Sequence, residues 1–350
     1  MLAGRGDFNR LYSSGGTLEV SGWILDPDVP AASIRISVDD TVRGEQAPED
    51  REDVRDAFSG VAHARRSGFH FFLPHPNARS RITITALDGP NELIRIQSTF
   101  APEFEDLPVP GPALLSHILP GPDPLLFQAS GLFSYTCVMS ALSNRIDFSA
   151  CPRMLDWGCG SGRLSRLFLK SRPGPEVFGC DIDGEAVAWC HDNLPDGRFS
   201  LTGPLPPLPF PDGFFPLVIA YSVFTHLRRE TQLAWLDEMR RIIAPGGILL
   251  ASVHGPLAAS CAFSHRGRSR LARLFGRRRL SAVLSAVLKE GFFDAGEDRA
   301  LDGVAPAGYY RGVFQTPEWT RREWSRYFRV VEIRGGGMNS YQDLVILERP

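Results

Sequence analysis

The sequence predicts a two-part chain: an all-β sandwich, then an α/β unit whose mostly parallel sheet ends in an antiparallel hairpin. Apolar residues recur at period two before residue 100, and segments of strand and helix character alternate after residue 150. A proline-rich stretch separates the two patterns. Because 350 residues exceed one ordinary domain, we predict a β-sandwich domain over 1–104 and an α/β domain over 105–350.

The first part reads as short strands separated by turn residues. Apolar or alternating segments of strand length stand at 17–24, 34–38, 68–73, 81–87 and 92–97. Only one brief charged segment, 48–58, has helical character. Several short strands at this spacing favour a β-sandwich.

The boundary falls in the segment 102–124, which reads PEFEDLPVPGPALLSHILPGPDP. Prolines at this density disfavour both a helix and a central strand, so we expect a linker or an extended wrap.

The second part alternates strand and helix. We expect strands at 154–157, 177–181, 217–222 and 248–253, and helices at 162–170, 184–193 and 229–243. This order predicts a parallel sheet covered by helices. The last two strands, 330–333 and 343–347, have no helical pattern between them and should pair antiparallel.

A glycine-rich loop joins the first strand of the α/β part to its first helix. Residues 154–164 read MLDWGCGSGRL, which places Gly158, Gly160 and Gly162 at the strand-to-helix turn. Glycine allows a close approach of the main chain to a ligand and tolerates positive φ. The start of the helix adds unpaired N–H groups and the positive end of the helix dipole.

The residues around this loop decide which cofactor fits it. A dinucleotide site requires glycine at the sixth position of the motif, where this chain has Arg163. Asp156, two residues before the first glycine, would repel a pyrophosphate but favour an ammonium group. The charges therefore fit S-adenosylmethionine, which has a sulfonium, an ammonium and no phosphate, and they argue against a nicotinamide oxidoreductase.

Two acids follow the second strand, in the segment VFGCDIDGEAV. Asp181 stands at the strand end about 20 residues past the loop, where an acid accepts hydrogen bonds from ribose hydroxyls. Asp183 is the competing candidate, but it is better suited to cap the next helix.

These segments resemble the class I, Rossmann-like, S-adenosylmethionine-dependent methyltransferases over about residues 125–350. The motifs DWGCGSGRL, GCDID, LPPLPFPDGFFPLVIAYSVFTHL and EMRRIIAPGGILLASVHG occur in the family's order. The resemblance implies that the three glycines line the methionine portion of the cofactor, Asp181 binds ribose, Ile182 packs on adenine and Ser222 lies near the methyl group. The predicted cofactor-binding residues are Asp156, Gly158, Cys159, Gly160, Gly162, Asp181, Ile182 and Ser222.

The chain departs from the family pattern at two places. Segment 199–210 lacks the acid that often reads the adenine amine and offers only Thr202 and main-chain groups. Pro216 replaces a favoured aspartate at the start of the fourth strand, where proline is tolerated.

Two histidines stand where a catalytic base is expected. His226 follows the fourth strand and His254 the fifth, and ligands of open α/β sheets bind at that edge. Helix packing or capping is the competing interpretation for His226, and catalysis and structure are evenly balanced for His254. Methyl transfer needs a base only when the acceptor must lose a proton.

A long insert, 255–316, is predicted to form a lid or an acceptor-binding element. Its arginine run from Arg266 to Arg279 is either a solvated amphipathic helix or a contact for an acidic acceptor or a membrane surface. Further on, Tyr309, Tyr310, Arg311 and Gln315 are the predicted acceptor-binding residues, ahead of a helix starting near Pro317. Similar segments in related glycan and secondary-metabolite enzymes imply a hydroxyl-bearing small molecule or sugar.

Three fragments of the first part, SGWILDP at 21–27, REDVRDAF at 51–58 and SGFHFFLP at 67–74, resemble a small β-sandwich found beside bacterial surface-glycan glycosyltransferases and methyltransferases. We interpret Trp23, Arg51 and Asp53 as core anchors and loop tethers, with a carbohydrate-binding face as the alternative.

Composition narrows the function classes. The net charge of −2, together with the lack of a basic domain, argues against nucleic acid. The six cysteines show no CxxC spacing, so we expect neither a disulfide framework nor a metal site. We expect no transmembrane segment and a cytoplasmic location. The prediction is a methyltransferase acting at oxygen of a small or carbohydrate-linked acceptor, and the alternative is a non-catalytic module that binds the cofactor or a partner.

Overall fold

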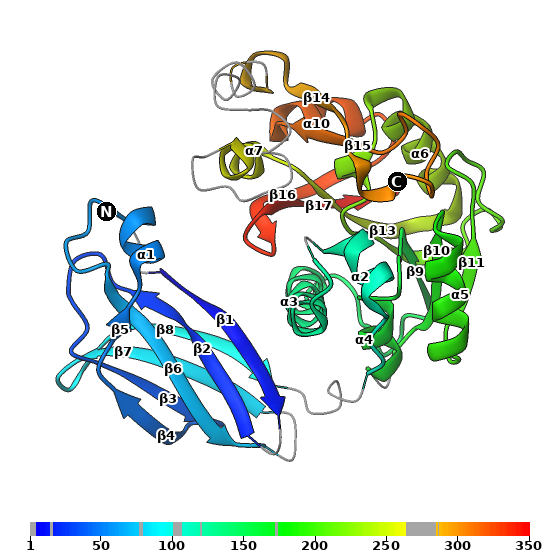
Figure 1. Ribbon diagram of the computed structural model, residues 1–350. Coiled ribbons are helices and arrows are strands. Elements are labelled where there is room, and N and C mark those ends of the chain that lie inside the picture. The colour runs from blue at the N-terminus through cyan, green and yellow to red at the C-terminus, as the bar shows by residue number, and fades with distance from the viewer. Residues whose placement is uncertain are drawn as a thin grey trace. The chain divides into compact units, whose positions relative to one another are not determined.

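A computed structural model describes residues 5–14, 17–76, 80–100, 107–119, 121–171, 174–263, 285 and 287–350. The chain divides into two compact units, Met1–Leu107 and Pro108–Pro350 (Figure 1). Each unit is described by itself below.

The N-terminal unit contains two four-stranded antiparallel sheets. One has the order β1 (Arg5–Ser14), β2 (Thr17–Leu25), β6 (Arg66–Pro74), β5 (Glu49–Asp50). The other has the order β4 (Thr41–Gln46), β3 (Ser33–Val38), β7 (Ser80–Asp88), β8 (Asn91–Phe100). Alternate residues of both sheets, such as Val20, Phe71, Ile36 and Ile84, enter one apolar core. This confirms the predicted all-β arrangement.

The short helix α1 (Glu52–Ala57) follows β5, and Arg51 ties this region to the sheet. Arg51 Nη1 donates to the carbonyl oxygen of Gly22 at 3.0 Å, and its guanidinium pairs with Asp53 at 2.6 Å. The ring of Trp23 lies 5.4 Å from that of Phe58. All three residues singled out in the sequence therefore have structural partners, which favours their interpretation as anchors and tethers.

The C-terminal unit is built on a seven-stranded sheet. Its order is β11 (Arg198–Leu201), β10 (Glu176–Asp181), β9 (Arg153–Trp157), β12 (Phe215–Ala220), β13 (Ile243–Val253), β17 (Gln342–Glu348), β16 (Arg329–Met338). The first five strands are mutually parallel, and β17 runs antiparallel to both of its neighbours, β13 and β16. The predicted fold class is thus confirmed.

The strand order reverses at β9, because β10 lies on one side of it and β12 on the other. Crevices at the carboxyl ends of parallel strands open at such a reversal. Three helices connect successive parallel strands: α4 (Ser165–Lys170), α5 (Gly184–Asn193) and α6 (Arg229–Ile242). Helix α10 (Pro317–Trp324) precedes β16. Leu155 and Trp157 of β9 pack in one cluster with Trp235 of α6 and Trp324 of α10.

The prediction that the proline-rich segment forms no helix is wrong. Helix α2 (Pro112–Ile118) lies within it, and α3 (Pro124–Leu142) begins at its last residue. In each helix a proline stands in the first turn, where its missing N–H would have no helical partner. Asp123 caps α3 by accepting hydrogen bonds from the main-chain nitrogens of Leu125 and Leu126.

By length and composition, α3 is the one helix among the described residues that could cross a membrane. It buries Phe127, Tyr135, Val138 and Leu142, and it packs against α4 and β16. We therefore assign α3 to the core of the C-terminal unit.

The insert between β13 and α10 has structure of its own. It contains α7 (Pro256–Phe263), β14 (Phe292–Glu297), the 3₁₀ turn η4 (Arg299–Leu301) and β15 (Arg311–Gln315). Strands β14 and β15 form a separate antiparallel pair. The arginine run from Arg266 to Arg279 lies outside the described residues, so the membrane contact predicted for it stays a prediction.

Candidate cofactor and acceptor site

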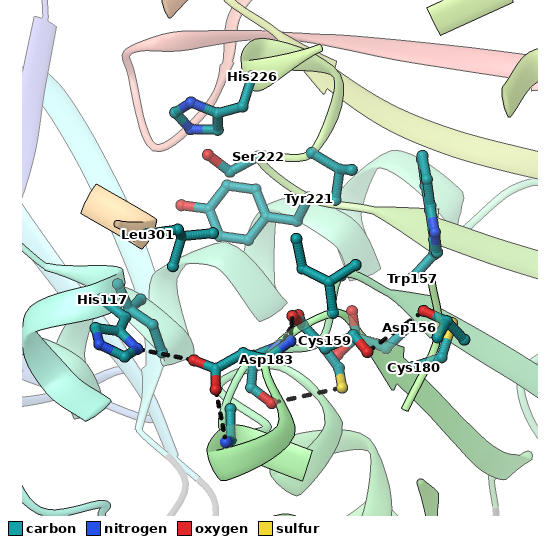
Figure 2. A pocket seen from close by; sticks show the side chains of 18 of the residues that line it. His117, Asp156, Trp157, Cys159, Cys180, Asp183, Tyr221, Ser222, His226 and Leu301 are labelled. Atoms are coloured by element: carbon teal, nitrogen blue, oxygen red, sulfur yellow. Dashed lines mark hydrogen bonds and ion pairs between the residues drawn. The ribbon is translucent and has the colours of Figure 1, made fainter. Parts of the chain in front are cut away.

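A pocket opens at the carboxyl ends of β9, β10, β11 and β12. The loop after β9 lines it, together with residues of α2, η4 and the turn before β15. Figure 2 shows His226 and Ser222 at one end of the pocket, His117 and Asp183 at the other, and Tyr221 between them.

The glycine loop has the backbone that its sequence predicts. Gly158, Gly160 and Gly162 have φ angles of +74°, +51° and +69°. A Cβ on Gly158 would also lie 2.3 Å from Cγ2 of Val223, in the loop after β12. The main chain can therefore follow this path only with glycine at that position.

Asp156 is a buried carboxyl at the base of this loop. It is 3% exposed and accepts a hydrogen bond from Ser165 Oγ at 2.6 Å. Burial raises its pKa to about 6. Ser161 Oγ, nearby in the pocket lining, is buried and has no hydrogen-bond partner among the described residues. An unpaired hydroxyl and an acid in one pocket suit a ligand that carries an ammonium group.

Asp181 links the loop to the end of β10. Its Oδ2 accepts from the main-chain nitrogen of Gly160 at 2.7 Å, and its Oδ1 accepts from that of Asp183 at 2.9 Å. Burial raises the pKa of this carboxyl. A carboxylate held by two main-chain donors keeps lone pairs for ribose hydroxyls.

Asp183 caps α5, as predicted, by accepting from the main-chain nitrogens of Glu185 and Ala186. Its other oxygen accepts from His117 Nδ1 at 2.8 Å (Figure 2). His117 lies on α2, so the sequence prediction of a linker or an extended wrap missed it. A helix-length run between Pro112 and Pro120 was the available signal.

Most of the residues predicted for the site lie together in this pocket. Those that line it are Asp156, Gly158, Cys159, Gly160, Asp181, Ile182, Ser222, His226, Tyr309 and Tyr310. Those outside its lining are Gly162, His254, Arg311 and Gln315.

The residues outside the lining have structural roles. A Cβ on Gly162 would meet Leu194 Cδ1 at 2.5 Å, so this glycine serves the packing of the loop on α5. Arg311 pairs with Asp294 across the β14–β15 ladder at 2.6 Å. Gln315 is buried and bonds to Gln232 and Thr320. Both side chains therefore have structural partners in or beside β15, and their contact with the acceptor stays a prediction.

His226 presents one ring nitrogen to the pocket. Its Nδ1 donates to the carbonyl oxygen of Arg311 at 2.9 Å, which leaves the lone pair on Nε2. The ring stacks on Tyr310, with centroids 3.9 Å apart and planes 14° apart. Burial lowers the pKa of His226 to about 4, so the imidazole is neutral near pH 7.

His254 has the same kind of anchor but lies deeper. Its Nδ1 donates to the carbonyl oxygen of Val313 at 3.2 Å, and its ring stacks on Phe314. It is 5% exposed, and burial lowers its pKa to about 3. Its centroid lies 6.0 Å from that of His226. The competing interpretation, a structural histidine, therefore fits His254.

Ser222 sits at the end of β12 in a strained backbone conformation, with φ at +60°. Its main-chain nitrogen donates to Ser252 Oγ at 2.8 Å, and its own Oγ accepts from Gln342 Nε2 at 3.0 Å. Ser252 Oγ donates to Gln342 Oε1 at 2.6 Å and closes the network. Neither Ser252 nor Gln342 was predicted, since no local pattern joins residues 120 positions apart.

The comparisons agree with this geometry. Residues 155–251 match the model of a family described as a methyltransferase domain. The C-terminal unit carries an S-adenosylmethionine-dependent methyltransferase domain. The matched segment holds the glycine loop, Asp181 and Ser222 of the pocket, and S-adenosylmethionine is its methyl donor.

Two curated relatives are similar to parts of the chain. The ubiquinone/menaquinone biosynthesis C-methyltransferase UbiE of Bordetella avium is 39% identical over 106 residues, 28% of this chain and 39% of that protein. The malonyl-[acyl-carrier protein] O-methyltransferase of Herminiimonas arsenicoxydans is 26% identical over 186 residues, 53% of this chain and 63% of that protein. The chain thus spans less than two thirds of either relative's length.

Among solved structures, an S-adenosylmethionine-dependent methyltransferase from Mesorhizobium loti aligns with 61% of this chain and 98% of its own. The sequence identity is 17% and the TM-score 0.43.

Proposed function

We propose that this chain transfers a methyl group from S-adenosylmethionine to a hydroxyl oxygen of a small-molecule or carbohydrate-linked acceptor. The observation that carries the proposal is His226. It is a neutral imidazole in the pocket wall, close to Ser222, with Nδ1 bonded to main chain and the lone pair on Nε2. A hydroxyl must lose a proton during methylation, and a fixed neutral imidazole is the side chain suited to accept it.

The residues of the pocket fit the cofactor. Asp156 supplies a negative charge for its ammonium group, Asp181 supplies acceptors for ribose hydroxyls, and glycine at 158 leaves room where a Cβ would clash. When bound, S-adenosylmethionine supplies an electrophilic methyl carbon. The protein contributes alignment of the acceptor and exclusion of water.

In the proposed reaction a bond forms between the acceptor oxygen and the methyl carbon as the bond from that carbon to sulfur breaks. His226 Nε2 takes the hydroxyl proton. Only neutral His226 can accept this proton, and its lowered pKa means that the imidazole is neutral near pH 7.

The insert contributes side chains that cover the proposed acceptor site. Leu301 of η4 and Tyr309 and Tyr310 before β15 line the pocket with apolar and aromatic surface. Burial raises the pKa of Tyr309 to about 12, so its hydroxyl stays protonated. These side chains support our proposal that the insert shields the acceptor from water.

The alternative, a module that binds without turnover, predicts no defined base. The anchored and stacked state of His226 favours catalysis over that alternative. The name of the Herminiimonas relative, an O-methyltransferase, is compatible with oxygen as the methylated atom.

Calorimetric titration of the chain with S-adenosylhomocysteine tests the first half of the proposal. Binding should be lost in Gly160→Arg, which fills the loop, and in Asp181→Ala, which removes both carboxyl oxygens. The absence of binding by the unaltered chain would defeat the methyltransferase proposal.

Transfer of labelled methyl from S-adenosylmethionine to acceptors tests the second half. The panel pairs each hydroxyl compound, phenols and sugars included, with the matching amine and thiol. We expect label on the hydroxyl compounds only. Label on amines or thiols, with cofactor binding intact, would overturn oxygen as the methylated atom and leave the methyltransferase standing.

A further inference from the structure

A second hollow, of about 320 Å³, opens where the ends of α6 and α10 meet the start of β16. Among the described residues, its lining contains no aspartate or glutamate but four arginines: Arg240, Arg321, Arg326 and Arg329. A hollow lined by one sign of charge attracts ligands of the opposite sign.

This hollow and the cofactor pocket share no lining residue and lie at opposite edges of the sheet. Strand β13 begins at Ile243, directly after α6, and β16 begins at Arg329. Both run in the direction of the parallel strands, since β17 is antiparallel to each. The arginines therefore stand at the amino-end edge of the sheet, whereas the cofactor pocket opens at its carboxyl-end edge.

Two of these arginines have no carboxylate partner among the described residues. Arg240 forms no ion pair there, and Arg321 donates only to the carbonyl oxygen of Val330, at 3.4 Å. The neighbouring Arg241, by contrast, pairs with Glu238 at 2.6 Å. The charges of Arg240 and Arg321 are thus available to a ligand.

The ion pairs of the other two arginines do not balance the charge. Arg326 pairs with Glu323 at 2.9 Å, but that carboxylate also pairs with Arg229 at 3.4 Å. Arg329 pairs with Glu348. The side chains of Arg326 and Arg329 are 59% and 63% exposed, so a ligand can reach both. Positive charge therefore stays in excess around the hollow even where ion pairs form.

A purely structural role explains part of this arrangement. A cation in the last turn of a helix is stabilised by the helix dipole, and Arg240 and Arg321 stand in the last turns of α6 and α10. That role does not require arginines from two helices and a strand to line one hollow. Their convergence is the observation that points to a ligand.

We propose that this hollow binds a small soluble molecule through its phosphoryl groups, with Arg240 and Arg321 as the main contacts. Arginine matches phosphoryl oxygens with paired hydrogen bonds, and several arginines suit a multiply charged anion. Tyr327 lines the same hollow and offers an aromatic surface and a hydroxyl to the rest of the molecule. The site is separate from the cofactor pocket, so the proposal does not rest on the proposed function.

Calorimetric titration of the full chain with pyrophosphate at low ionic strength tests the proposal. Arg240→Gln and Arg321→Gln should each weaken binding about 10-fold, the effect of one lost charge-assisted contact, and the double variant should show no binding. Glutamine stays polar, and neither substitution breaks an ion pair among the described residues. Saturating S-adenosylhomocysteine should leave the affinity for pyrophosphate unchanged, because no residue lines both sites.

Arg228→Gln is the matched control. Arg228 is exposed and precedes the first turn of α6, at the opposite end of the helix from Arg240. It removes the same charge from the chain but lies outside the hollow, so pyrophosphate should bind normally. Thermal unfolding of each variant reports separately on folding. Equal weakening in Arg228→Gln and Arg240→Gln would show general charge attraction only and would overturn the site.

A phosphoryl group can also belong to a lipid headgroup, so vesicles form the second arm. We would compare sedimentation of the chain with vesicles of phosphatidylcholine alone and with added phosphatidylglycerol. If pyrophosphate does not bind, but the anionic vesicles do and the double variant releases them, the occupant is a membrane surface and the soluble ligand is wrong. Pyrophosphate binding that survives in the double variant, or that S-adenosylhomocysteine displaces, would place the anion elsewhere and defeat the proposal. Failure of both probes to bind would defeat it too.

Discussion

The two halves of the pocket are built in different ways. All of the predicted cofactor-binding residues except Ser222 lie in one continuous segment, 154–183, which relies on main-chain geometry: three glycines at positive φ and a carboxylate that accepts two main-chain N–H bonds. The acceptor half combines His226, Leu301 and Tyr310 from separate segments. We conclude that the first half depends on local sequence and the second on packing of the insert.

The difference is clearest at the two histidines. His226 and His254 both donate from Nδ1 to carbonyl oxygens of β15, at Arg311 and Val313. Only His226 lines the pocket. Strand β15 of the insert therefore fixes the tautomer of both rings. The two histidines differ in their depth below the pocket surface: His226, the proposed base, lines the pocket and His254 does not.

The largest effect should come from breaking the cofactor half. Gly158→Ala places a Cβ 2.3 Å from Val223 Cγ2 at φ +74°. Backbone strain and overpacking each cost about 1–3 kcal/mol, so we expect a loss of about 1000-fold in affinity for S-adenosylhomocysteine. Titration calorimetry measures it. Gly246→Ala is the control, since Gly246 has the same φ of +74° with open space around it. Equal losses in both variants would contradict the steric argument.

The second-largest effect should come from a substitution in the acceptor half that leaves cofactor binding unchanged. His226→Asn keeps an N–H near the carbonyl of Arg311 but removes Nε2. We expect kcat to fall by about 100-fold, as for a lost general base, with unchanged binding of S-adenosylhomocysteine. The matched variant His254→Asn should keep kcat within about 3-fold of the unaltered chain. A larger loss in His254→Asn than in His226→Asn would exchange their roles.

A smaller effect should follow from loosening the link between loop and strand. Asp181→Asn replaces one accepting oxygen by an amide group, so one of the two main-chain donors loses its partner. We expect about 10-fold weaker binding of S-adenosylhomocysteine, the effect of one lost hydrogen bond to a charged group. Asp192→Asn on the exposed face of α5 should bind normally. Unchanged binding in Asp181→Asn would argue against the role of this carboxylate.

The last prediction concerns stability and sharpens the comparison of the histidines. The folded pKa of His254, about 3, lies below its ordinary value of 6.5. The unfolded chain therefore binds more protons between these values, and the stability that neutral His254 provides is complete above pH 6.5 and declines as the pH falls. Between pH 7 and pH 5, the free energy of unfolding should fall by about 2 kcal/mol less in His254→Asn than in the unaltered chain. Urea unfolding at the two pH values measures it, and an equal loss in both proteins would refute the assignment.

The sequence by itself determined the parts whose physics is local. Glycine spacing at the turn, an acid two residues before it, and Asp183 ahead of a helix each act within a few residues, so their signals are visible in the chain order. The alternation of strands and helices likewise determined the sheet and its antiparallel end.

Only the tertiary structure decided which distant side chains meet in the pocket. His117 meets Asp183 across 66 positions, Gln342 meets Ser222 across 120, and Asn339 meets Tyr221 across 118. The same holds for β15. The carbonyl oxygen of Arg311 accepts a hydrogen bond from Nδ1 of His226, which leaves Nε2 for the pocket, and the side chains of Arg311 and Gln315 bond to structural partners. These contacts leave no periodic trace in the sequence, because each depends on the depth and register at which separate elements pack.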